Sequence, residues 1–137
     1  MKAYKLITII LVLLMFGCSS GIDSNKIVGN WKIVSFKVDM PNLNPEIIKL
    51  GEKEALSTSY LFRKNHSFQM KSAVFMDGIE GNWEIDQEAN TLKLKDNSFD
   101  NGIPQIQKII YLDSRNMQWV ETFDSLGTIN MTLERTQ

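Results

Sequence analysis

The sequence predicts an all-β fold: eight antiparallel strands, in chain order, closed as an up-and-down barrel with one short helix after the first strand. Apolar and polar residues alternate over most of the chain after residue 27, as on strands that cover a core with one face. Short turns separate the alternating runs, and short links force neighbouring strands to run antiparallel. Closing the strands into a barrel would remove both sheet edges, and a two-sheet sandwich is the competing arrangement.

The first strand is expected at 28–38. It begins with a glycine and a tryptophan and carries apolar residues on both faces, so at least one end of it should be covered twice. Asn44 then provides a helix N-cap and Pro45 suits the first helical position, which predicts a helix over 45–56. A helix of this length would cover an edge or an open end of the sheet.

In the rest of the chain, apolar and polar residues again alternate with a period of two. The pair Asp77-Gly78 is typical of a two-residue hairpin between alternating runs. Pro104 suits the start of a strand, where a missing amide donor is tolerated. The remaining seven strands are expected at 58–63, 68–76, 79–86, 91–95, 103–112, 117–122 and 128–135.

The N-terminus has the layout of a secretory signal. Lys2 and Lys5 form a positive segment, an apolar run extends from Leu6 to Phe16, and the small Gly17 ends it. The run is too short to span a hydrocarbon core, which needs ~20 residues. Residues 1–17 are therefore expected to be removed from the mature protein.

The chain has a single cysteine, Cys18, directly after this leader. Gly17-Cys18 followed by Ser19-Ser20 resembles a bacterial lipoprotein lipobox, in which the signal is cut before the cysteine and the thiol is lipidated. The resemblance implies a lipoprotein signal peptide at 1–17, the lipidated cysteine and a tether at 18–26, and a barrel domain at 27–137. It also implies a membrane-anchored protein of the bacterial cell envelope, facing the periplasm or the exterior. An ordinary signal peptide with a chance cysteine is the alternative.

Composition excludes several function classes. The 137 residues carry a formal net charge of −1 with no cluster of Lys and Arg, which argues against a nucleic-acid partner. A four-ligand zinc site cannot be assembled from one histidine, His66, and one cysteine. No pairing of a nucleophile with a base emerges either, so neither a metal, a cofactor nor a catalytic set is expected.

The side chains on the expected inner face are aromatic or flexible and apolar. If the barrel leaves a cavity, this face would accept a small hydrophobic ligand. A filled core is the alternative, and the protein would then be an interaction module that meets another protein of the envelope. The candidates for ligand contact are Tyr60, Phe62, Phe68, Met70, Val74, Met76, Trp83, Trp119 and Met131, and the same face is expected to hold Ile85, Ile110, Leu112, Ile129 and Leu133.

Three short motifs carry a family resemblance. They are Gly29-Asn30-Trp31, the segment from Leu61 to Phe68, and Gly81-Asn82-Trp83 followed by Leu92-Lys93-Leu94. In this order the chain resembles, over 27–135, the lipocalin-like lipoproteins common in Bacteroidetes-type bacteria. Asn65-His66 stands where the family usually has Asp-Gly. The resemblance implies that Trp31 lies at the closed end of the barrel and that Arg135 packs over its ring.

Overall fold

The computed structural model describes residues 21–98 and 103–137. The expected leader, 1–17, and the expected lipidation site, Cys18, lie outside the described residues. The described chain forms β1 (Gly29–Asp39), β2 (Ser59–Phe62), β3 (Ser67–Lys71), β4 (Ile79–Asp86), β5 (Thr91–Asp96), β6 (Gln105–Leu112), β7 (Asn116–Phe123) and β8 (Gly127–Thr136), with the helices α2 (Ser24–Ile27) and α3 (Pro45–Ser57).

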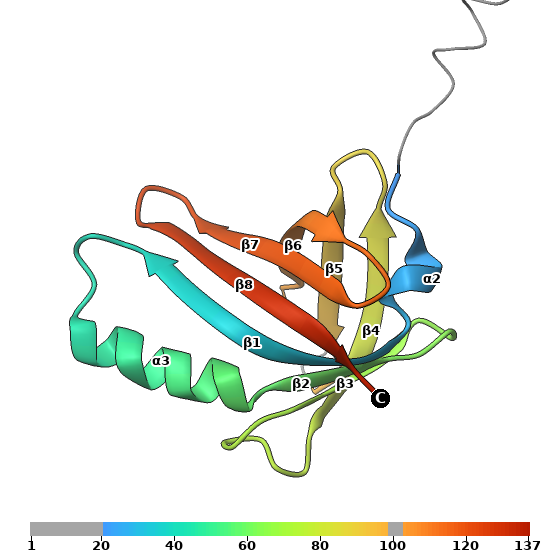
Figure 1. Ribbon diagram of the computed structural model, residues 1–137, viewed down its shortest axis with the longest axis horizontal. Coiled ribbons are helices and arrows are strands. Elements are labelled where there is room, and N and C mark those ends of the chain that lie inside the picture. Colours follow the sequence, from blue (N-terminus) through green and yellow to red (C-terminus); the bar gives the residue numbers. More distant parts are fainter. Residues whose placement is uncertain (1–20, 99–102) are drawn as a thin grey trace, which may run out of the picture.

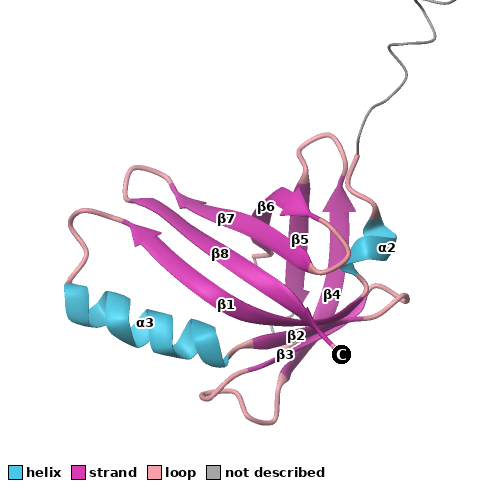
Figure 2. Cartoon of the chain, viewed as in Figure 1, coloured by secondary structure: helices cyan, strands magenta, loops and turns pink. Residues whose placement is uncertain are grey.

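The eight strands form a closed antiparallel barrel in chain order, and β8 returns to pair with β1 (Figure 1). The predicted fold is therefore confirmed, and strands dominate the chain (Figure 2). The Ile33–Leu133 pair and the Trp31–Arg135 pair fix the register of this closing ladder. Closure pairs the first and last strands, so neither is left as a sheet edge.

A bulge in β1 explains why that strand is apolar on both faces. Its pairing with β8 shifts between Ile33 and Ser35. Trp31 and Ile33 are buried before the bulge, and Phe36 packs against the core after it. An extra residue on one strand reverses the alternation of side chains beyond it. The inward face of β1 therefore moves from odd to even positions.

Helix α3 follows the local signals in the sequence. The Asn44 side chain accepts a hydrogen bond from the Glu46 amide at 2.8 Å, and Pro45 occupies the first turn. β2 pairs with residues 29–32 of β1, and α3 lies beside the rest of that strand (Figure 1). Ala55 is buried there, and a Cβ added at Gly51 would lie 3.7 Å from the Phe36 ring. The helix covers a flank that β2 is too short to reach.

The prediction of a strand over 68–76 is wrong after residue 71. β3 ends at Lys71, and residues 72–78 form a loop. The amides of this loop bond to α3 instead of to a strand: Ala73 donates to the Ser57 hydroxyl at 2.9 Å and Val74 to a Glu54 carboxylate oxygen at 3.4 Å. Val74 is 69% exposed and Met76 is 78% exposed, so neither lies inside the barrel.

The prediction of which β6 residues face the interior is also wrong. Gln107 and Ile109 are buried, whereas Ile106 and Ile110 are about half exposed. The pairing of β6 with β7 shifts between Ile109 and Tyr111. Only beyond this irregularity does Leu112 pack against the core, as expected.

Helix α2 is an element that the sequence analysis assigned in part to the tether. The Asp23 side chain accepts from the Asn25 amide at 3.0 Å and begins one helical turn. Ile27, at the end of this turn, is fully buried. Its carbonyl accepts a hydrogen bond from the Trp31 indole at 2.7 Å. The chain is therefore attached to the barrel before β1 begins.

Arg135 completes this end of the barrel. Its guanidinium carbon lies 4.4 Å from the centre of the Trp31 ring. The same group donates to the carbonyls of Ser114, Val28 and Lys26 at 2.7, 2.7 and 2.6 Å. It thus joins β8 to the β6–β7 turn and to the segment that enters β1.

Gly29 is required by this arrangement. Its φ of 138° is one that side-chain-bearing residues rarely adopt, and a Cβ there would overlap the Arg135 guanidinium. The glycine two positions before Trp31 therefore leaves the space that the guanidinium fills.

We expect Arg135→Ala to lower the free energy of unfolding by about 2–4 kcal/mol, because three charged hydrogen bonds and a cation–π contact are lost together. Urea denaturation followed by circular dichroism measures this. Arg115→Ala, at an exposed position of the neighbouring turn, is the matched control and should change stability by less than about 0.5 kcal/mol. Equal effects of the two substitutions would show that Arg135 does not close the barrel.

Candidate ligand-binding site

Different loops connect the strands at the two ends of the barrel. The turns at 63–66, 87–90 and 113–115 lie at the end that holds α2, Trp31 and Arg135, which we call the closed end. The link containing α3, the 72–78 loop and the β7–β8 turn lie at the opposite, open end, because links alternate between ends in an up-and-down barrel. Residue Ile22 is bonded to Gln87 of the β4–β5 turn, and the C-terminus follows β8, so both lie at the closed end (Figure 1).

A cavity of about 350 Å³ lies toward the open end. Its wall is mainly apolar, with one carboxylate and one amide. Six strands or strand-flanking segments contribute, so the cavity belongs to the barrel interior rather than to one surface loop. The lining side chains are Tyr60, Phe68, Met70, Ile79, Leu94, Asp96, Ile103 and Gln105.

The β6 side of this wall continues into a buried polar pair. Gln107 follows Gln105 on the same face of β6 and is 2% exposed. Its amide nitrogen donates to a Glu121 carboxylate oxygen on β7 at 3.5 Å. The other atom of the amide, Oε1, is buried and has no hydrogen-bond partner among the described residues. A buried amide oxygen left in this state costs about 1–3 kcal/mol unless a ligand or water pairs with it.

Two aromatic side chains connect this pair with the cavity. Tyr60 lines the cavity and packs edge-on against Trp119, with ring centres 5.5 Å apart. Trp119 is fully buried, and its indole nitrogen is a second buried polar atom for which the described chain supplies no partner. The interior therefore combines an apolar wall with unpaired polar atoms, which is the composition of small-molecule sites.

Burial changes the acidity of two titratable groups inside the barrel, Tyr60 and Glu121. It raises the pKa of the Tyr60 hydroxyl, and the nearby Glu121 carboxylate raises it further. Burial also raises the pKa of Glu121, against a smaller lowering effect of the hydrogen bond from Gln107. Tyr60 therefore stays a neutral hydroxyl in the physiological range.

The pKa of the Asp113 carboxyl group is also shifted, but this residue lies in a turn and not in the cavity. Asp113 accepts from the Tyr111 hydroxyl at 2.7 Å and from the amides of Arg115 and Asn116. These hydrogen bonds, the one from Tyr111 most of all, lower the pKa of Asp113 to about 2. The carboxylate holds the β6–β7 turn in shape.

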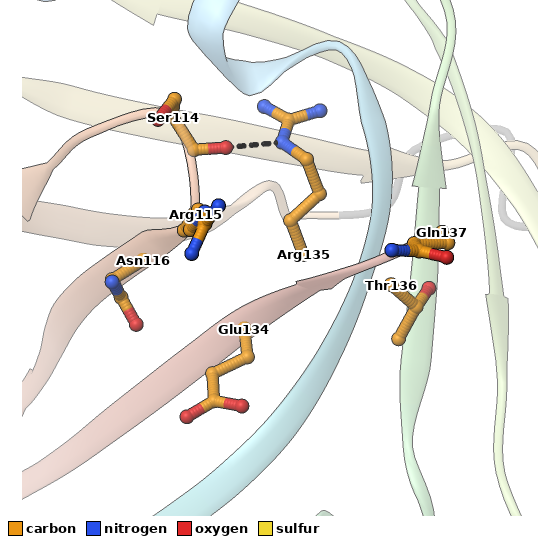
Figure 3. A pocket seen from close by; sticks show the side chains of 7 residues that line it. All are labelled: Ser114, Arg115, Asn116, Glu134, Arg135, Thr136 and Gln137. Atoms are coloured by element: carbon orange, nitrogen blue, oxygen red, sulfur yellow. Dashed lines mark hydrogen bonds between the residues drawn. The ribbon is translucent and has the colours of Figure 1, made fainter.

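The closed end carries a wider depression, of about 680 Å³, on the outside of the barrel. Figure 3 shows Arg135 pointing toward Ser114 and bonding to its carbonyl, while Glu134 points away from it. The guanidinium is already bonded to three carbonyls and packed on Trp31, so it is not free to bind an anion. We therefore assign this depression to barrel closure.

The candidate ligand-contact residues fall into three groups. Tyr60, Phe68 and Met70 line the cavity. Phe62, Trp83 and Trp119 are buried in the core beneath it, and Met131 is half-buried against that core. Val74 and Met76 lie on the exposed 72–78 loop.

The polar members of the site were not predicted. Gln105, Gln107 and Glu121 are absent from the expected ligand contacts because polar side chains usually face water. The signal available in the sequence is the period of β7, in which Glu121 continues the alternation of Met117 and Trp119. That alternation places a carboxylate on the inner face.

His66 has a local structural role. Its φ of 64° is left-handed, so the residue takes the conformation that a glycine would adopt in this turn. Its ring stacks on Trp83 with centres 4.6 Å apart. The Asn65 side chain accepts from the Ser67 amide at 3.1 Å and completes the turn. Asn65 and His66 thus form this turn without a glycine.

Residues 21–98 and 103–137 contain no group of three or more His, Cys, Asp or Glu side chains placed to hold a metal ion. Neither helix in this part of the chain is long and apolar enough to cross a membrane.

No protein-family model matches the chain, and no curated protein matches its sequence. Its structure is similar to the crystal structure of a DUF4847 family protein from Bacteroides vulgatus, with 14% sequence identity and a TM-score of 0.49. The match covers 80% of this chain and 94% of that chain. At this identity and score the similarity transfers no residue role to the present chain.

The raised pKa of Glu121 predicts a pH-dependent stability. Burial penalises the carboxylate in the folded state, so wild-type stability should fall as pH rises from the ordinary glutamate pKa of ~4.3 through the folded value. Glu121→Gln keeps an acceptor for Gln107 and removes the charge. The variant should therefore gain stability over wild type as pH rises through this window, with the difference vanishing below it.

Urea denaturation at a series of pH values measures the difference. Glu134→Gln, at an exposed position on β8, is the matched control and should show no such trend. A constant difference between Glu121→Gln and wild type across the window would contradict the placement of Glu121 inside the barrel.

Proposed function

We propose that the protein binds a small, mainly hydrophobic molecule in the open end of the barrel, and that the mature chain is anchored to a bacterial envelope membrane through a lipidated Cys18. The cavity beside Tyr60 and Met70 is the main observation that supports ligand binding. Its volume is near the lower end of the ~300–1,000 Å³ typical of ligand sites, which favours a compact ligand.

The closed end supports one direction of ligand entry. Ile22 accepts a hydrogen bond from the Gln87 side chain at 2.8 Å, which fixes the start of the described chain against the β4–β5 turn. Four residue steps separate Cys18 from Ile22 and span at most about 14 Å, so a lipid on Cys18 would hold the closed end near the bilayer. The open end would then face away from the anchoring membrane, and the ligand would enter from the aqueous side.

We propose no catalytic role. The polar side chains inside the barrel are amides, carboxylates, a phenol and an indole, without an adjacent nucleophile in the described chain. Binding and release are the chemistry that this set supports, since covalent catalysis needs a nucleophile held by a base.

A second candidate is an interaction module for another envelope protein. The rim of the open end favours it, because Val74, Phe75, Met76 and Ile103 expose apolar side chains there. Contiguous exposed apolar groups of this kind often mark contact surfaces. In that case, filling the cavity would leave function intact, whereas polar substitutions on the rim would abolish it.

Substitution of Met70 tests the cavity directly. N-phenylnaphthylamine, a neutral fluorescent probe, should bind the wild-type domain, and Met70→Trp should weaken this binding at least about tenfold because the indole fills the cavity. Met76→Trp places the same side chain on the exposed loop and should leave affinity unchanged. Circular dichroism confirms that both variants fold. Equal probe binding by Met70→Trp and wild type would rule out the cavity as the site.

The anchor predicts a change in fractionation. Full-length protein expressed in a bacterium with lipoprotein processing should partition with membranes and carry the added mass of acyl chains, because several chains on one residue anchor firmly. Cys18→Ala should release it to the soluble fraction, whereas Ser19→Ala should not. Wild-type protein with a free Cys18 thiol, detected by mass spectrometry, would overturn this half of the proposal.

A further inference from the structure

We infer that the cavity selects ligands whose polar end is a protonated amine over carboxylates of the same chain length. The inference rests on the proposed function and specifies its ligand class. It is carried by the arrangement of Glu121, Gln107 and Asp96 around an interior without a basic side chain in the described chain.

The acceptors lie on the inner faces of three neighbouring strands. Asp96 of β5 lines the cavity, and Gln107 of β6 is bonded to Glu121 of β7 at 3.5 Å. That hydrogen bond uses the amide nitrogen of Gln107 and fixes the direction of the side chain. The unpaired Oε1 of the same amide therefore awaits a donor. An ammonium group offers three donors and a positive charge to such a set.

The described wall of the cavity contains no basic side chain. None of the eight described lining residues is basic. The ion pairs found among the described residues join Arg63 of the β2–β3 turn to Glu80 of β4, and Lys93 of β5 to Glu84 and Asp86 of β4. Neither Glu121 nor Asp96 belongs to these pairs, so each retains its capacity to bind a cationic group.

The donors that the interior does offer are neutral. They are the hydroxyl of Tyr60, the amide group of Gln105 and the unpaired indole nitrogen of Trp119. A carboxylate ligand would lose its hydration, gain at most these neutral hydrogen bonds, and lie near the charge of Glu121. An alcohol is uncharged, so Glu121 does not repel it and it loses less hydration than an ion. It should therefore bind with intermediate affinity.

Competition among three compounds of one chain length tests the inference. Octylamine, octanol and octanoate are titrated at neutral pH against N-phenylnaphthylamine bound to the folded mature domain. Octylamine should bind at least about tenfold more tightly than octanoate, with octanol between them. Glu121→Gln should reduce this amine-to-carboxylate ratio at least about threefold, and Glu134→Gln should leave it unchanged.

Each result has a distinct meaning. Octanoate binding as tightly as octylamine, with octanol also bound, would overturn the charge preference and leave the binding function standing. A ratio unaffected by Glu121→Gln would overturn the inference, because the carboxylate of Glu121 would then not set the preference. If neither the probe nor any of the three compounds binds, the proposed function itself fails, and the inference fails with it.

Discussion

The structure depends on one guanidinium group. Arg135 covers the Trp31 ring and bonds to three main-chain carbonyls from the segment before β1 and from the β6–β7 turn. These contacts connect the last strand to the first at the point where an up-and-down barrel must close. Gly29 supplies the space for it, and Ile27 seals the core beneath it. One end of the barrel is therefore filled, and any internal space must lie toward the other end.

The open end follows from the lengths of the strands. β2 pairs with the first four paired positions of β1, whereas β8 follows β1 as far as Asp39. This difference leaves one flank of β1 without a strand neighbour, and α3 covers it. The interior there is not packed as densely as at the closed end, and it holds a cavity, a buried amide and a carboxylate. Buried polar atoms without partners are rare in stable cores, and a bound water or ligand would pair with them.

Local signals predicted most of the fold. Alternation located all eight strands, and the cap at Asn44 with Pro45 located α3 within one residue of its end. The errors arise where tertiary contacts override the local pattern. Side chains of α3 bind the amides of the 72–78 loop, which removed Val74 and Met76 from the interior. β6 places Gln107 and Ile109 inward and Ile110 outward, and its pairing with β7 shifts only after Ile109; hydrophobicity alone predicts the opposite.

Methyl-labelled methionine NMR tests the central claim, that a ligand enters at the open end of a barrel closed at the other. Met70 lines the cavity, Met117 is fully buried away from it, and Met76 lies on the exposed loop. Addition of octylamine should shift the Met70 methyl resonance in a saturable manner and leave those of Met117 and Met76 in place. A saturable shift confined to Met76, or no shift of Met70, would contradict a ligand site inside the barrel.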